Sequence, residues 1–285
     1  MTMGAAMGAE PLRMACVEPR PTNRAVRPRR MADLVADEIR SQILSGRFPR
    51  DAVLPRQGTL HDTYGVSPPS LREALRILEA EGLATTIRGN VGGVQLHPPR
   101  PEKVAYLLAM VLQDRAVAFQ DLVGSLGDLE ALCAALAAAR DDREEIVAML
   151  RNRLDHSRTV FYDTEEYVRS ARAFHTDLVR ACGSDTLEVI VTVVETVFSS
   201  QMYEFLHGDV NQAAFADLAM REDCLETHTA ITDAIAEGDV LRAARLTREH
   251  MREPTKQSLL PPDLIVQSNA VRDDVADRRD RPAPR

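Results

Sequence analysis

The sequence predicts a mainly α protein in two parts: a small domain of three helices and a β-hairpin, then an all-α bundle of six or seven helices. Aromatic residues make up 4% of the 285 residues and tryptophan is absent, so the 45% of hydrophobic residues are mostly Ala, Leu and Val. Such residues favour helix-on-helix packing. Residues 31–97 mix helical and β-like patterns, whereas 102–260 show helical patterns only.

The elements of residues 31–97 follow from periodicity and from glycines that end them. The segments QGTLHDTYG and SPPSLREALRILEAEG predict the second and third helices, ended by Gly65 and Gly82. The runs LATTIR and GVQLH flank GNVGG and predict a hairpin. In the first helix, MADLVADEIRSQILSG, the expected apolar stripe consists of Leu34, Val35, Ile39, Ile43 and Leu44.

The turn YGVS before the third helix indicates a helix-turn-helix. Gly65 supplies the tight turn and Val66 an apolar plug, and either Ser67 or Ser70 can cap the helix. Pro68 fits the first turn, where no N–H is needed. Three helices plus a β-hairpin wing form the winged helix-turn-helix layout, in which the polar start of the third helix enters a DNA major groove. The residues expected to face inward are Leu71, Ala74, Leu75 and Leu78.

The remaining segments are expected to be a disordered basic arm (1–30), a stiff linker (98–101) and a disordered tail (261–285). The stretch EPRPTNRAVRPRR in the arm is either a solvated tail or a contact to DNA phosphates. The net charge of −8 argues against a protein that coats nucleic acid uniformly, but it allows a local basic patch.

Cysteine usage and hydropathy predict a cytoplasmic protein without a membrane segment. The four cysteines form no Cys-x-x-Cys pair, which suits a reducing compartment. No apolar run reaches the ~18 residues of a membrane span, and no signal peptide is recognisable.

Three histidines in the second part are spaced to meet inside the bundle. His228 lies 10 residues before Gly238 and His250 lies 12 after it, at ~15 and ~18 Å along two antiparallel helices. They would face each other at one level, with His175 arriving from a third helix. Three neutral imidazoles can hold Zn²⁺ or Ni²⁺ and leave a position open to water or an effector.

The first part resembles the GntR family of bacterial transcription regulators, in the FadR-like branch. The resemblance rests on IRSQILSGRF, VLPRQGTL, YGVSPPSLREALRILEAEGL and RGNVGGVQLHPP. It implies a regulator, expected to be a repressor, that binds a palindromic double-stranded operator as a homodimer, with Arg72 as the recognition-helix arginine. The residues expected at the DNA are Arg56, Ser67, Pro69, Ser70, Arg72, Arg76, Arg88, Asn90 and Gly92.

Two positions depart from the family pattern at this surface. Pro68 stands where relatives often have arginine, and it can offer an apolar contact, for example to a thymine methyl group. Gly58 stands at another common arginine position, so we expect Arg56 to take over that phosphate contact.

The second part is similar to FCD-type effector domains through AFH, ETHTAITDAIAEGD and LTREHM. This resemblance implies a divalent metal beside a metabolite, a carboxylate or acyl compound. Ala171 replaces the family carboxylate four residues before His175, and Gly127 or its neighbour replaces an effector-binding arginine before Leu129-Glu130. We therefore expect weaker metal binding and a larger, more apolar effector.

Two other functions fit parts of the sequence. A metal-dependent hydrolase could use the three histidines to activate water, but it would need a general base and leaves the winged domain unexplained. A helical scaffold could simply pack the histidines in its core.

Overall fold

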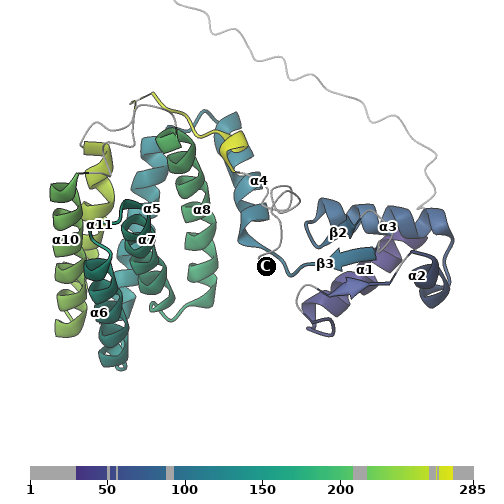
Figure 1. Cartoon of the computed structure of the whole chain (residues 1–285), viewed down its shortest axis with the longest axis horizontal. Coiled ribbons are helices and arrows are strands. Elements are labelled where there is room, and N and C mark those ends of the chain that lie inside the picture. The colour runs from purple at the N-terminus through teal and green to yellow at the C-terminus, as the bar shows by residue number, and fades with distance from the viewer. Residues whose placement is uncertain are drawn as a thin grey trace, which may run out of the picture.

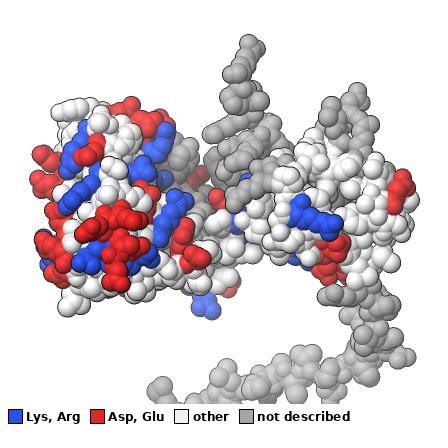
Figure 2. Space-filling model, turned by 90° about the horizontal axis from the view of Figure 1, so that it is seen from below, with Lys and Arg blue, Asp and Glu red and all other residues white. Residues whose placement is uncertain are grey.

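The computed structural model describes residues 30–49, 52–55, 57–87, 93–207, 217–256, 261 and 263–271. Figure 1 shows a small domain of helices and short strands, and a larger helical bundle, joined where helix α4 begins. The predicted mainly α fold is confirmed. Charged side chains crowd the bundle in Figure 2, whereas the small domain shows few of them from that side.

The small domain has the predicted order of elements, with one strand added. Its elements are α1 Met31–Leu44, β1 Val53–Leu54, α2 Gln57–Tyr64, α3 Pro68–Ala80, β2 Ala84–Ile87 and β3 Gly93–Leu96. The antiparallel sheet has the order β1-β3-β2. Strand β1 is only two residues long, too short for an alternating pattern to reveal it.

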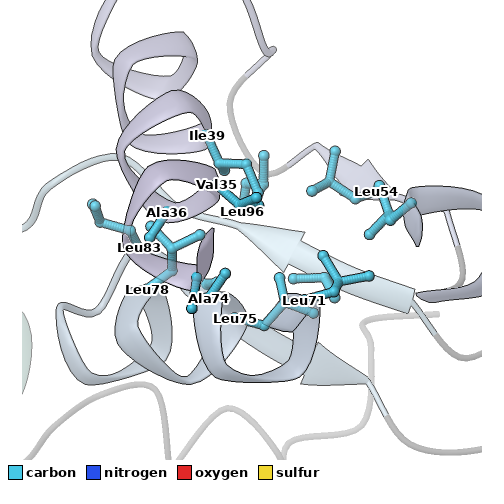
Figure 3. Packing of buried hydrophobic residues seen from close by; sticks show 14 of the residues in the cluster. Val35, Ala36, Ile39, Leu54, Leu71, Ala74, Leu75, Leu78, Leu83 and Leu96 are labelled. Atoms are coloured by element: carbon cyan, nitrogen blue, oxygen red, sulfur yellow. The ribbon is translucent and has the colours of Figure 1, made fainter. Parts of the chain in front are cut away.

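The core of this domain lies between α1, α3 and the sheet (Figure 3). The four inward positions predicted for α3 are all buried, as the helical period requires. The stripe predicted for α1 was wrong at Leu34 and Leu44, which are 43% and 63% exposed. The buried face of α1 keeps Val35 and Ile39 of the predicted stripe and adds the small residues Ala32 and Ala36, which let the helix approach α3 closely.

The described part of the bundle contains seven long helices, in agreement with the prediction. They are α4 Pro101–Asp114, α5 Phe119–Ala138, α6 Arg143–Thr159, α7 Thr164–Arg180, α8 Asp185–His207, α10 Leu218–Glu237 and α11 Val240–Lys256. Helices α10 and α11 form the predicted hairpin at Gly238, which adopts a left-handed φ of 69°. Helix α5 packs closely against α11, where Gly127 faces the backbone of that helix.

Residues 263–271 return to the bundle instead of extending away from it. Phe119 N donates to the Leu264 carbonyl at 2.7 Å, and Val266 N donates to the Val117 carbonyl at 3.1 Å. Val266 is fully buried against α4 and α8. The prediction of a disordered tail is therefore wrong for this segment. It rested on the overall composition of residues 261–285, which is rich in Asp, Arg and Pro and obscures the few apolar residues at the start of the segment. The rest of the predicted tail, 272–285, and the basic arm up to residue 29 lie outside the described residues.

Candidate functional site

The start of α3 is built as the sequence suggests. Gly65 has a φ of 60°, which favours glycine, and Val66 is buried beneath the turn. Ser67 is the N-cap: its hydroxyl accepts from Ser70 N at 3.4 Å and contacts the Ser70 hydroxyl at 2.9 Å. The structure thus decides between the two serines. Pro68 occupies the first turn.

Most of the polar positions predicted for DNA on α3 lie at the surface. Ser67, Pro69, Arg72 and Arg76 are exposed, and Ser70 is half-buried. Arg76 is 3.6 Å from the Glu73 carboxylate, an exposed pair that contributes little to stability. The other four predicted positions lie outside the described residues: Arg56, Arg88, Asn90 and Gly92.

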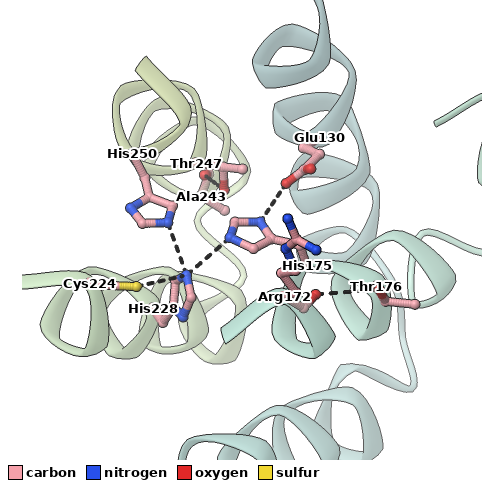
Figure 4. A network of polar contacts seen from close by, with 9 residues as sticks. All are labelled: Glu130, Arg172, His175, Thr176, Cys224, His228, Ala243, Thr247 and His250. Atoms are coloured by element: carbon pink, nitrogen blue, oxygen red, sulfur yellow. Dashed lines mark hydrogen bonds and ion pairs between the residues drawn. The ribbon is translucent and has the colours of Figure 1, made fainter. Parts of the chain in front are cut away.

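The three predicted histidines converge inside the bundle (Figure 4). His228 Nε2 lies 3.2 Å from His175 Nε2 and 3.0 Å from His250 Nε2. The candidate ligand atoms of all three residues lie within 4.8 Å of one another. Their convergence is confirmed, with one residue each from α7, α10 and α11.

Two further side chains fix the orientation of these rings. The Glu130 carboxylate of α5 accepts from His175 Nδ1 at 2.6 Å, so the Nε2 lone pair points into the cluster. The Phe174 ring stacks on His228, with centroids 4.0 Å apart. Sequence reasoning did not assign either residue to the site. The sequence did offer a signal for Glu130, because this acidic residue shares a helix face with apolar residues such as Leu126 and Ala134, and a buried acid requires a polar partner.

The cluster disfavours protons on two of its rings. Burial lowers the pKa of His228 well below its usual range, and the neighbouring histidines lower it further. Burial and His175 lower the pKa of His250 to about 3. Burial also opposes charge on His175, but attraction to Glu130 and the hydrogen bond with it raise the pKa overall. Two neutral imidazoles and a third oriented by a carboxylate match the donors that Zn²⁺ or Ni²⁺ requires.

A cavity of about 50 Å³ is lined by His175 but by neither of the other two histidines. Burial raises the pKa of the Glu195 carboxyl on this wall, although Arg172 opposes the shift. Ala171 lies one turn before His175 on α7 and supplies no ligand atom. The polar lining of the cavity consists of Glu130, Thr176, Arg180, Glu188, Thr192 and Glu195.

A winged helix-turn-helix with an exposed polar helix start, joined to a helical domain with a buried polar cluster, defines a class of DNA-binding regulators with a separate sensing domain. Residues 31–92 match the bacterial regulatory proteins of the gntR family, and residues 124–253 match the FCD domain. The chain belongs to the GntR family of bacterial regulatory proteins and carries an FCD domain.

Relatives share both parts of the chain. The transcriptional repressor GlaR of Escherichia coli is 27% identical over 222 residues, covering 76% of this chain and 90% of GlaR. The repressor NanR of an Enterobacter strain is 24% identical over 237 residues, covering 78% of this chain and 83% of NanR. The solved structure of a Streptococcus agalactiae GntR protein has the same fold, with a TM-score of 0.55, 20% identity, and coverage of 79% of this chain and 99% of that one.

Hydropathy adds one finding on the described part of the chain. None of its helices combines the length and apolar character that crossing a membrane requires.

Proposed function

We propose that this regulator is a cytoplasmic repressor that binds a palindromic operator as a homodimer and releases it when a metabolite binds the bundle. Regulation of transcription follows from the family. Repression is supported by relatives that are named repressors, GlaR and NanR. The observation that carries the DNA-binding role is the capped, exposed start of α3.

The roles at the DNA follow from the position of each side chain on α3. Arg72, exposed one turn into the helix, reads base edges, and Arg76 one turn later contacts phosphate. Ser67, Pro69 and Ser70 at the helix start approach the groove through their side chains, because the two prolines carry no N–H and Ser70 N is already bonded to the Ser67 hydroxyl. The proposal extends the DNA-binding role to Arg56, Arg88, Asn90 and Gly92, which lie outside the described residues.

The homodimer is supported by an apolar stripe on α4. Val104, Leu107 and Val111 are 52%, 50% and 51% exposed and recur at intervals of three and four residues. The opposite face of α4, with Ala105 and Ala109, is fully buried in the bundle. A second copy of the chain would cover this stripe by twofold symmetry, which matches a palindromic operator.

Sensing is assigned to the cluster of His175, His228 and His250. These residues would hold a divalent cation, Zn²⁺ or Ni²⁺, which would supply positive charge for an oxygen atom of the effector. The cavity beside His175 is far smaller than the ~300 Å³ of typical ligand sites, so an effector must open it. Helices α5, α7 and α8 line this cavity. An effector that binds only when these helices are moved apart would shift the bundle from a closed state to an open state.

Footprinting on the DNA upstream of the protein's own gene tests this proposal. We expect protection of two half-sites related by twofold symmetry, and loss of protection with a metabolite that binds the bundle. Uniform protection without half-sites would contradict the dimer. Protection that no bound metabolite alters would contradict the sensing role.

A further inference from the structure

Cys224 of α10 lies beside the histidine cluster, and the proposed function gives it no role. It stands one helical turn before His228, and its Sγ is 3.8 Å from His228 Nε2 (Figure 4). That single nitrogen therefore has three close neighbours, the Nε2 atoms of His250 and His175 and the thiol, at 3.0, 3.2 and 3.8 Å.

Hydrogen bonding cannot account for all three contacts. An imidazole Nε2 has one in-plane position, which holds either a proton or a lone pair, so it forms one good hydrogen bond. Ligands around a tetrahedral Zn²⁺ ion are instead separated by about 3.3 Å between two nitrogens and by about 3.5 Å between nitrogen and sulfur, given the usual bond lengths. The two separations between histidine nitrogens are close to such an edge. Cys224 Sγ lies 3.8 Å from His228 Nε2 but outside the group of ligand atoms that lie within 4.8 Å of one another, so it adjoins the histidine cluster through His228.

We propose that Cys224 is the fourth ligand of the metal, as a thiolate, and completes a site of one cysteine and three histidines. This inference rests on the proposed metal site. When the cation binds, the thiol releases its proton to solvent and a metal–sulfur bond forms, without any change of oxidation state. The anion that Ala171 no longer supplies from α7 thus comes from α10, and a sulfur ligand selects Zn²⁺ over harder cations.

The surroundings of the thiol suit this role. Cys224 is half-buried, and the buried Tyr167 hydroxyl, which donates to the Arg221 carbonyl at 2.6 Å, also lies within hydrogen-bonding distance of it. Burial raises the pKa of the Cys224 thiol to about 11. In the protein without metal the thiol therefore keeps its proton, and the cation is what makes the thiolate favourable. Reaching an ion shared with all three histidines requires rotation of the thiol about its Cα–Cβ bond, because its contact within the cluster is with His228.

Cobalt(II) substitution gives a direct readout of the sulfur ligand. We expect the full-length protein, with Cys16→Ser to remove the thiol of the N-terminal segment, to bind one Co²⁺ and show a near-ultraviolet sulfur-to-cobalt charge-transfer band. Cys224→Ser in this background should lose the band and bind Zn²⁺ at least about tenfold more weakly in competition with a chelating dye. Cys133→Ala, which changes a buried thiol in the apolar core of the bundle, should keep the band.

The outcomes separate this inference from the proposed function. Cobalt binding without the band, or a band that persists in Cys224→Ser, overturns the thiolate ligand and leaves the histidine site standing. Absence of cobalt binding overturns both. A band lost in Cys133→Ala but kept in Cys224→Ser would place the sulfur ligand elsewhere and likewise overturn the proposal. Circular dichroism of each variant confirms that it is folded.

Discussion

At the scale of single residues, Glu130 shows how a buried acid can orient a candidate metal ligand without being a ligand itself. Glu130 is 1% exposed on a helix that is rich in Ala and Leu. Its carboxylate accepts a hydrogen bond from His175 Nδ1. We expect Glu130→Gln to weaken Zn²⁺ binding by about 10–100-fold, because the ring loses its fixed tautomer. Isothermal titration calorimetry measures this change. Asp128→Asn, an exposed acid on the same helix, should bind Zn²⁺ normally; equal weakening in both variants would argue against the specific role of Glu130.

Arg72 is the residue on which the proposed DNA recognition most depends. We expect Arg72→Ala to reduce operator affinity by at least about tenfold, since a good base contact is worth about 1–3 kcal/mol. Fluorescence anisotropy with labelled operator DNA measures this change. Arg169→Ala, at the exposed surface of α7, is the control and should bind as the unaltered protein does. Operator binding by Arg72→Ala at full affinity would show that α3 does not read the DNA.

The same histidines make the stability of the metal-free protein depend on pH. The pKa values of His228 and His250 lie below the ordinary value of 6.5, so the unfolded chain takes up protons that the folded cluster resists. Their contribution is complete above pH 6.5 and is lost as pH falls, at up to about 1.4 kcal/mol per pH unit for each proton. The raised pKa of His175 acts in the opposite sense, but only above pH 6.5.

Urea unfolding in the presence of a chelator, between pH 7.5 and 5, tests this dependence. The free energy of unfolding should fall between pH 6.5 and 5, and less steeply in His250→Gln. His156→Gln, at an exposed position of α6, should follow the unaltered protein. A slope that His250→Gln leaves unchanged would contradict the assignment.

At the scale of elements, two glycines of α5 make opposite predictions. A Cβ on Gly127 would lie 3.0 Å from the Met251 Cβ of α11, whereas a Cβ on Gly124 would meet nothing within 4 Å. We expect Gly127→Ala to destabilise the bundle by about 1–3 kcal/mol, because the two helices must move apart. Gly124→Ala should instead stabilise it by up to about 1 kcal/mol, because alanine favours helix. Thermal unfolding of both variants checks the contrast, and similar melting temperatures would refute the close contact.

Elements with a strong period were predictable from the sequence, and elements defined by distant partners were not. The apolar face and glycine boundaries of α3 fixed both its bounds and its exposed side. The spacing about Gly238 placed His228 opposite His250. Strand β1 exists only through its pairing with β3, and Glu130 joins the cluster only when α5 meets α7. No local pattern encodes those meetings.

At the scale of the whole molecule, the proposed dimer contact through the apolar stripe on α4 would couple the oligomeric state to DNA binding. We expect Leu107→Glu to convert a dimer into a monomer, because a charge at the centre of the stripe cannot be buried unpaired. Size-exclusion chromatography with light scattering measures the mass, and operator affinity should fall with it. Leu241→Glu is the control, since Leu241 is 82% exposed at the start of α11, away from the stripe. A dimer that survives Leu107→Glu would place the interface elsewhere.

The contact between residues 263–271 and the bundle has a consequence for the order in which the two domains fold during translation. The winged domain is complete by residue 97 and can fold while the rest is still being translated, since domains generally fold as units from the N-terminus. The Phe119–Leu264 hydrogen bond and the burial of Val266 must wait until residues 264–266 have been synthesised. The winged domain, which would bind DNA, is therefore folded before the helical bundle that would control it. A nascent chain stalled after α11 would have a folded winged domain attached to a bundle that still lacks the contacts of residues 263–271.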